Sequence, residues 1–246
     1  MHIPDGFIDA PTSAAYGAVA VAGVGYAVRR ASAEVDDQVV PLAGLCAAFV
    51  FAGQMLNFPV ALGTSGHLLG GVLAAVLVGP WLGAIAIAVV LLVQSLFADG
   101  GLTALGLNIT NMAIVGALLG YLLFRLVLRV LPARLGSVPA AAGTAALVTV
   151  PLAAASFVLQ FAVGGTVDLP LGGVTGAMLG VHVLIGIGEA FITAATVSLV
   201  VATRPDLVYG ARHLLERAPL EIRGAAGVQA GGAAISGAAV TGKVDA

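Results

Sequence analysis

Long apolar stretches, separated by short breaks rich in glycine, proline and polar residues, follow one another along most of the chain. A helix needs about 20 residues to cross the hydrocarbon core of a bilayer, and most of these stretches reach that length. They predict helices at about 12–28, 40–57, 65–79, 80–98, 106–131, 137–163 and 174–203. The pattern is typical of an all-α integral membrane protein with about seven transmembrane helices.

Charged residues are few, and they are placed asymmetrically. They make up 9% of the chain, against about 25% in a soluble domain. If the N-terminus lies outside, all ten lysines and arginines fall on or near the cytoplasmic side. The predicted outer segments carry only acids, namely Asp5, Asp9, Asp99 and Asp168. By the positive-inside rule, we expect a multi-pass protein of the cell membrane with its N-terminus outside and its C-terminus in the cytoplasm.

The apolar pattern ends near residue 203. It predicts a membrane domain over residues 1–203, a charged cytoplasmic segment over 204–223, and a disordered Gly/Ala-rich tail over 224–246. The N-terminus has no basic region of a signal peptide, so we expect the mature chain to begin with a free amine at Met1. The single cysteine, Cys46, argues against a cysteine-rich zinc site, and no basic run indicates nucleic-acid binding.

The third predicted helix, from Ser65 to Gly79, is short at about 22 Å. Pro80 begins the next helix at once, so the turn between them is tight. The segment from Asn57 to Gly66 must then dip into the membrane, where irregular backbone is tolerated only inside protein or along a cavity. We therefore expect a recessed pocket on the outer side, with His67 at its floor.

Two of the four histidines, His2 and His67, lie on this outer side. The Met1 amine, the His2 backbone nitrogen and the His2 Nδ1 can close a five-membered and a six-membered chelate ring around one metal ion. The His67 imidazole would complete a square of nitrogens, which suits Ni(II) or Cu(II) better than the tetrahedral preference of zinc. The alternative is that His2 is an exposed terminal residue and His67 a hydrogen-bonded residue at a helix start.

The hexapeptide Met-His-Ile-Pro-Asp-Gly at residues 1–6 and the segment Gly-Thr-Ser-Gly-His-Leu-Leu-Gly-Gly at 63–71 closely resemble the CbiM/NikM family. These proteins are the substrate-capture (S) components of energy-coupling-factor importers for cobalt and nickel. The resemblance runs to about Arg223 and includes residues 94–101, 106–108 and 188–190. It implies a transport subunit rather than an enzyme, with Ni(II) or Co(II) as cargo, no further cofactor, and metal ligands from Met1, His2 and His67.

The resemblance also implies partners. These are a transmembrane coupling (T) protein and ABC-type ATPase subunits, and no Walker A pattern occurs in the chain itself. Some family members carry a fused companion module, whose helices we do not find in the tail, so we expect a separate small N-type membrane component. Small residues could form the contact with the coupling protein, although internal helix packing explains them equally well: Ala14, Ala18 and Ala22, and Ala43 and Ala47.

Several polar residues near the predicted outer helix ends could orient the metal ligands: Asp5, Asn57, Ser65, Asn108 and Asn111. Turn formation by the aspartate and helix capping by the asparagines are the alternative roles. His182 and Glu189 lie seven residues apart on one face of the last predicted helix. We expect structural hydrogen bonds to neighbouring helices from this pair.

Two other functions deserve comparison with metal capture. Gly63-Thr64-Ser65-Gly66 matches the short motif of rhomboid intramembrane proteases, which would make Ser65 the nucleophile and His182 its base, but that reading leaves His2 and His67 without a role. A stand-alone metal carrier or channel would need a polar path across the membrane. Because the polar residues cluster on one side, the sequence favours a capture subunit.

Overall fold

A short helix, α3 (Gly71–Val78), lies at the centre of the fold, and every one of its residues is buried. The computed structural model describes residues 1–34, 39–61, 64–97 and 99–215. Pro80 begins α4 directly after Gly79, whose φ of 93° reverses the chain. This is the tight turn that the sequence predicts, since glycine reaches positive φ at little cost.

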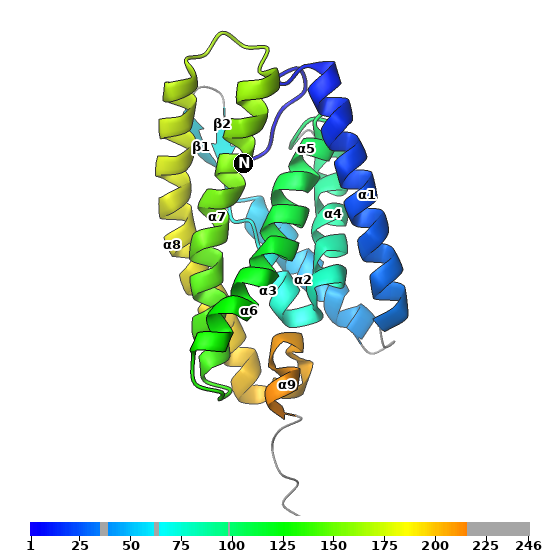
Figure 1. Cartoon of the computed structure of the whole chain (residues 1–246), viewed down its shortest axis with the longest axis vertical. Coiled ribbons are helices and arrows are strands. Elements are labelled where there is room, and N and C mark those ends of the chain that lie inside the picture. The colour runs from blue at the N-terminus through cyan, green and yellow to red at the C-terminus, as the bar shows by residue number, and fades with distance from the viewer. Residues whose placement is uncertain (35–38, 62–63, 98, 216–246) are drawn as a thin grey trace, which may run out of the picture. The chain divides into compact units, whose positions relative to one another are not determined.

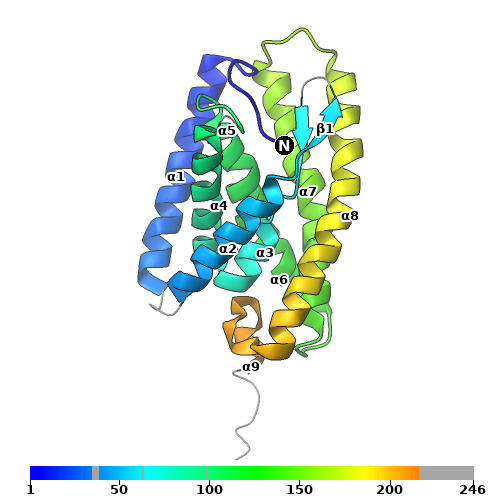
Figure 2. The ribbon, with the colours of Figure 1, turned by 180° about the vertical axis from the view of Figure 1, so that it is seen from behind.

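Longer helices surround α3, as Figures 1 and 2 show. They are α1 (Ala10–Glu34), α2 (Val39–Gln54), α4 (Pro80–Leu96), α7 (Ser137–Gly164), α8 (Leu171–Thr203) and the continuous helical stretch made by α5 (Leu105–Ile109), the π-helical η1 (Thr110–Leu119) and α6 (Gly120–Val130). The helices α7 and α8 run side by side. Gly143 of α7 lies so close to the backbone of Ala190 in α8 that a side chain would crowd it, which is the small-residue packing typical of membrane helices.

Within the described residues, three helical stretches are long and apolar enough to cross a membrane: 105–130, 137–164 and 171–203. The helices α2 and α4 are apolar but shorter. Large apolar side chains of α8 point outward, among them Leu184, Phe191 and Leu199, which are 68%, 76% and 67% exposed. A multi-pass membrane protein is thus supported, while the count of about seven spans and the orientation stay predictions.

The structure corrects the all-α prediction between α2 and α3. Residues predicted to begin a helix at Ser65 instead form β2 (Thr64–Gly66), which pairs antiparallel with β1 (Phe58–Ala61), and α3 begins only at Gly71. Gly70 adopts a left-handed φ of 73° just before α3. The glycines at both ends of residues 66–71 interrupt the helix, so His67 lies in extended chain.

Beyond α8, the predicted charged segment folds back as short helical turns: η2 (Pro205–Leu207), η3 (Tyr209–Ala211) and α9 (Arg212–Leu215). Gly210 packs against the ring of Phe124, and Tyr209 packs against Gly79. The rest of the predicted segment, 216–223, and the predicted tail, 224–246, lie outside the described residues.

Residues 1–9, which we call the N-terminal arm, run from the start of α1 into the molecule. The chain end lies between α7 and the β1–β2 hairpin (Figures 1 and 2). Ile8 pairs with Gly165 in a single antiparallel bridge, and the Asp9 amide donates to the Gly164 carbonyl at 2.7 Å. The arm is therefore fixed at its base to the end of α7, and its tip is inside the fold.

Candidate metal centre

The tip of the N-terminal arm is buried although it is a chain end. Met1 and Ile3 have no exposed surface, and His2 is 5% exposed. The Ile3 amide donates to Asn108 Oδ1 at 2.8 Å, and Asn108 Nδ2 donates back to the Ile3 carbonyl at 3.2 Å. The Gly101 amide donates to the same carbonyl at 2.9 Å. These bonds satisfy the polar backbone of an extended segment that could not otherwise be buried.

The two histidines predicted as ligands are brought into contact. The rings of His2 and His67 stack with centroids 4.4 Å apart and planes 26° from parallel. His67 has no exposed surface. His67 is therefore buried under the arm and does not face the open pocket that the sequence predicts, and its place on the outer side of a membrane stays a prediction.

The hydrogen bonds of His67 define which of its nitrogens is available. Nδ1 lies 2.7 Å from the Leu68 carbonyl oxygen, which can only accept, so Nδ1 carries the proton. Nε2 then holds a lone pair, and it is buried without a partner. A backbone carbonyl that fixes one imidazole nitrogen and leaves the other bare is the usual arrangement of a metal-ligating histidine.

His2 is held by two side chains from the end of α4 and the loop after it. Its Nε2 lies 3.1 Å from Gln94 Oε1, and its Nδ1 lies 3.2 Å from Asp99 Oδ1. The second contact has the distance of an ion pair without the alignment of a hydrogen bond, so Nδ1 also counts as buried and unpartnered. If Nε2 donates to Gln94, the Nδ1 lone pair faces a carboxylate oxygen, and a bound cation would relieve that repulsion.

Burial keeps the basic groups of the arm uncharged. It lowers the pKa of the Met1 amine from 8.0 to about 4, although the nearby Asp99 carboxylate opposes the shift. Burial also lowers the pKa of His2, against the opposing effect of Asp99. The contact with His2 in turn lowers the pKa of Asp99. The buried arm thus presents neutral nitrogens beside one carboxylate, which is the protonation state that metal binding requires.

The other predicted orienting residues do different things. Asp5 Oδ1 accepts from the Thr103 amide at 2.7 Å and from its hydroxyl at 2.6 Å, which ties the arm to the loop before α5. Asn57 Nδ2 donates to Asp99 Oδ2 at 3.2 Å and so reaches His2 only through Asp99.

Two more of these residues lie away from the histidines' hydrogen bonds. Asn111 in η1 forms a reciprocal amide pair with Gln160 of α7, with both bonds 2.9 Å long. Ser65 is half-buried in β2 opposite Pro59. Their roles in orienting ligands stay predictions, and neither hydrogen-bonds His2 or His67 in the part of the chain that the structure describes.

The predicted small-residue faces differ in exposure. Ala14, Ala18 and Ala22 are exposed along one side of α1. Ala43 of α2 is buried, and Ala47 is half-buried. The face on α1 is therefore accessible for a partner, whereas Ala43 is used in internal packing.

The prediction that His182 and Glu189 hydrogen-bond to neighbouring helices is wrong for His182, which bonds within its own helix, whereas Glu189 does reach another element, at the backbone just before α3. His182 Nδ1 lies 2.7 Å from the Met178 carbonyl oxygen one turn earlier in α8, and Glu189 accepts from the backbone of residues 69 and 70. Among the described residues, no hydrogen bond joins His182 to Ser65. The protease alternative therefore finds no support in the structure.

Gln94 and Asp99 are the two site residues whose roles the sequence did not suggest. They occur in a stretch that resembles the family, yet nothing in their spacing connects them to residue 2. A signal was present, because Gln94 is the only amide in the otherwise apolar α4, and polar groups within membrane helices are usually functional.

Comparisons with known proteins identify the family of this chain. Residues 2–207 match the sequence model of the CbiM family, described as the cobalt uptake substrate-specific transmembrane region. A relative from Archaeoglobus fulgidus, which carries the name of a fused nickel transport protein NikMN, is 40% identical over 215 residues, covering 85% of this chain and 68% of the relative. The cobalt transport protein CbiM of Sorangium cellulosum is 36% identical over 217 residues, covering 85% of this chain and 94% of that protein.

A solved structure shows the same fold. The crystal structure of a truncated transition metal transporter superimposes with a TM-score of 0.76 at 30% identity, covering 82% of this chain and 99% of that one. The family match spans the arm from His2 onward, the histidine pair and all the membrane-spanning candidates. This chain therefore belongs to the CbiM family of transmembrane cobalt and nickel transport proteins.

Proposed function

We propose that this chain is the metal-capture subunit of an ATP-driven energy-coupling-factor importer, and that it binds one Ni(II) or Co(II) ion between the N-terminal arm and His67. The proposed ligands are the Met1 amine, the His2 backbone nitrogen, the His2 Nδ1 and the His67 Nε2. Four nitrogens in a plane favour Ni(II) over Co(II) on geometry. The names of the relatives, which include both nickel and cobalt transport proteins, support this pair of ions.

The observation that carries the proposal is a concentration of unpartnered polar atoms. Among the described residues, the buried side-chain atoms without a hydrogen-bond partner are His2 Nδ1, Gln54 Oε1, His67 Nε2, Gln94 Nε2 and His182 Nε2. His2 lies on the arm and His67 on residues 66–69, and the Gln54, Gln94 and His182 side chains lie beside one or the other of these two segments. Each such atom costs about 1–3 kcal/mol when buried unsatisfied. A cation held by the two imidazoles would satisfy the most basic of them.

The donor set also accounts for the use of the chain end. The described residues contain no group of three or more His, Cys, Asp and Glu side chains that could hold a metal ion. A site at His2 and His67 would therefore need further ligands, and the chain end offers two. The amine and the first amide nitrogen supply them, because they are already part of the same chelate as the His2 imidazole.

The proposed cycle assigns a role to each part of this end of the molecule. The arm brings the His2 chelate onto His67, and the β1–β2 hairpin covers the pair. The proposed orientation places this end outside the cell, with the basic C-terminal turns in the cytoplasm. A transmembrane coupling protein, ATPase subunits and a separate small N-type component would then drive release of the ion into the cytoplasm.

The ligand assignment is tested by moving the amine. A single glycine inserted before Met1 should weaken nickel binding by more than about a hundredfold, since loss of an outer-shell contact already costs 10–100-fold and this insertion removes a ligand. The measurement is calorimetric titration of the purified protein, together with the visible spectrum of bound nickel. The matched control carries the same glycine after Ala246. Equal affinity in the two extended proteins would contradict the chelate.

The transport assignment is tested in cells that lack other nickel importers. Uptake should require the co-produced coupling protein and ATPase, and it should disappear when the ATPase cannot hydrolyse ATP. Nickel binding by the purified chain should remain. Full uptake by the chain alone would instead identify a stand-alone carrier.

A further inference from the structure

The extended segment that carries His67 is held by buried side chains of two different helices. From α8, Glu189 accepts both the Leu69 amide, at 2.6 Å, and the Gly70 amide, at 2.9 Å. From α2, Gln54 Nε2 donates to the Leu69 carbonyl at 2.7 Å. The backbone two and three residues after His67 is thus fixed on both its donor and its acceptor side. In Figure 2, α2 and α3 lie below the chain end, and α8 runs along one side of it.

Glu189 is an unusual residue for this position. It is 1% exposed, and it is the only buried carboxylate in the described ranges. Within those same ranges, no salt bridge joins it to a lysine or arginine. A carboxylate inside an apolar helix is costly, and such residues are usually kept for a function. Its two amide bonds stabilise it only in part, because they bring no opposite charge.

The segment has little freedom to move away from this clamp. A side chain at Gly70 would come within 2.7 Å of the Val50 side chain, and one at Gly71 would lie 2.5 Å from the backbone of Gly116. The start of α3 is therefore packed against α2 and η1 without a gap. A change in the clamp would therefore act on the extended segment before Gly70, which holds His67 against the ring of His2.

We propose that Glu189 is the positioning residue of the metal centre, which sets the place of His67 Nε2 through the backbone of residues 67–70. This inference rests on the proposed function, and it gives a role to the Gly188-Glu189-Ala190 stretch, which lies far from His67 in the sequence.

The test compares two isosteric substitutions one helical turn apart. Glu189→Gln keeps the shape, loses the charge and leaves one oxygen for two amides. Thr193→Val, also buried on α8, is the control. The glutamine variant should bind nickel at least about tenfold more weakly, as expected for an outer-shell contact. Its bound nickel should show a shifted visible band, because the fourth nitrogen is displaced. The valine variant should match the wild type in both.

A purely structural role predicts a different result. Glu189→Gln would then lower the unfolding temperature but bind nickel with wild-type affinity and an unchanged band, and that outcome would overturn the proposal. If the wild type itself does not bind nickel, the proposed function fails. If the wild type binds and the glutamine variant binds equally well, only the role of Glu189 fails.

A measurement on the wild type keeps the proposal testable if the glutamine variant does not fold. The Leu69 and Gly70 amides should exchange slowly with solvent before nickel is added, and more slowly afterwards, because the ion stabilises the state in which the clamp is closed. The Ile3 amide reports arm docking in the same experiment. Slower exchange at Ile3 with no change at residues 69 and 70 would contradict a link between Glu189 and the ion.

Discussion

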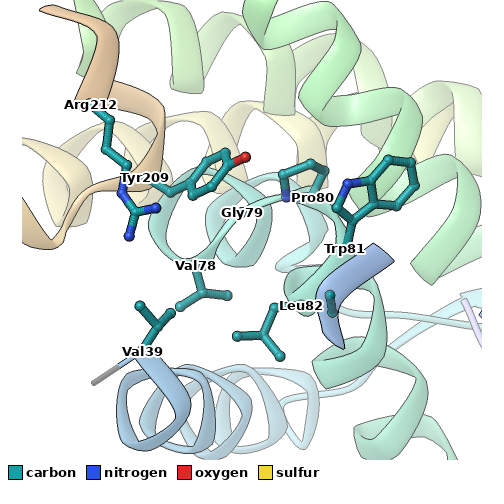
Figure 3. A pocket seen from close by; sticks show the side chains of 9 residues that line it. Val39, Val78, Gly79, Pro80, Trp81, Leu82, Tyr209 and Arg212 are labelled. Carbon is teal, nitrogen blue, oxygen red and sulfur yellow. The ribbon is translucent and has the colours of Figure 1, made fainter. Parts of the chain in front are cut away.

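The two ends of the helical unit, one at the turn between α3 and α4 and the other at the N-terminal arm, differ in how their polar groups are paired. At the turn between α3 and α4, shown in Figure 3, Val78, Gly79, Pro80, Trp81, Tyr209 and Arg212 surround a cavity of about 20 Å³, room for about one water molecule. The cationic group in its lining, Arg212, is 4.9 Å from the Tyr209 ring centre, and Arg30 lies nearby, 5.7 Å from the ring centre of Trp81. At the arm end, the chain is extended, the rings are packed together, and bare nitrogens remain.

The comparison shows that a visible cavity and a site for an ion are separate properties. The void beside Pro80 is lined mainly by apolar side chains and by Arg212, which already lies over the ring of Tyr209, so it is best explained as a packing joint. The rings of the histidine pair are packed against each other, and His2 Nδ1 and His67 Nε2 lack partners in a setting where an unsatisfied polar atom is costly. A site for an ion is therefore expected where buried polar atoms lack hydrogen-bond partners, and a cavity alone does not indicate one.

The largest effect should come from removing an imidazole at the arm end. His67→Ala should weaken nickel binding by more than about a hundredfold, because it removes a proposed ligand whose loss exceeds that of an outer-shell contact. His213→Ala, in α9 beyond the packing joint, removes an imidazole at the opposite end and should leave the affinity unchanged. Calorimetric titration of both variants measures the difference. Equal losses of nickel affinity in the His67→Ala and His213→Ala variants would mean that the metal centre is not confined to the arm end.

Features of the two ends that depend on residues close together in the sequence could be predicted from it, and features that depend on residues far apart in the sequence mostly could not. The apolar stretches predicted the helices well, since their length and composition are local properties. The pairing of His2 with His67 was also predictable, because a chain end beside a histidine is a chelate in itself. The start of α3 was predicted wrongly at Ser65, since the apolar residues after Gly66 outweighed the glycines that interrupt the helix.

Contacts between distant segments could not be predicted in the same way. Gln94 and Asp99 meet His2 only because the arm folds back between α7 and the hairpin. Asn111 was expected near the ligands but pairs with Gln160, and either partner satisfies an asparagine in a membrane helix equally well. Sequence reasoning therefore identified the residue types that suit a metal ion, and tertiary packing decided which of them contact one another.

A smaller effect is expected on the docking equilibrium of the N-terminal arm, which should change gradually with pH when no metal is present. The buried Met1 amine has a pKa of about 4 against 8.0 when exposed, so between these values the undocked end binds one proton more than the docked end. Docking should therefore strengthen as pH rises from 6 to 8, by up to about tenfold per unit, and level off above 8. Protonation of His2 in the undocked arm adds to the loss at the acid end, because burial lowers its pKa too.

Hydrogen exchange at two amides measures this effect at both ends of the molecule. After correction for the intrinsic pH dependence of exchange, protection of the Ile3 amide, which donates to Asn108, should follow the docking curve. The Gly83 amide, which donates to the Gly79 carbonyl at the packing joint, should show constant protection. A flat profile at Ile3 would mean that the chain end is not buried as a neutral amine.

The smallest effect should come from the packing joint itself. Arg212→Ala removes the cation above the Tyr209 ring and should lower the free energy of unfolding by about 0.5–1 kcal/mol, the usual contribution of an exposed cation–π contact. Arg212→Lys should recover part of this loss, since the charge is kept while the planar stacking is not. Nickel affinity should stay within about twofold of the wild type in both variants. A tenfold change would require a coupling of about 1.4 kcal/mol between Arg212 and the metal centre, and no contact that could carry it is expected. Denaturant unfolding and calorimetric titration give the two quantities. A large fall in affinity with little loss of stability would show that this end also takes part in holding the ion, and the distinction between joint and site would have to be abandoned.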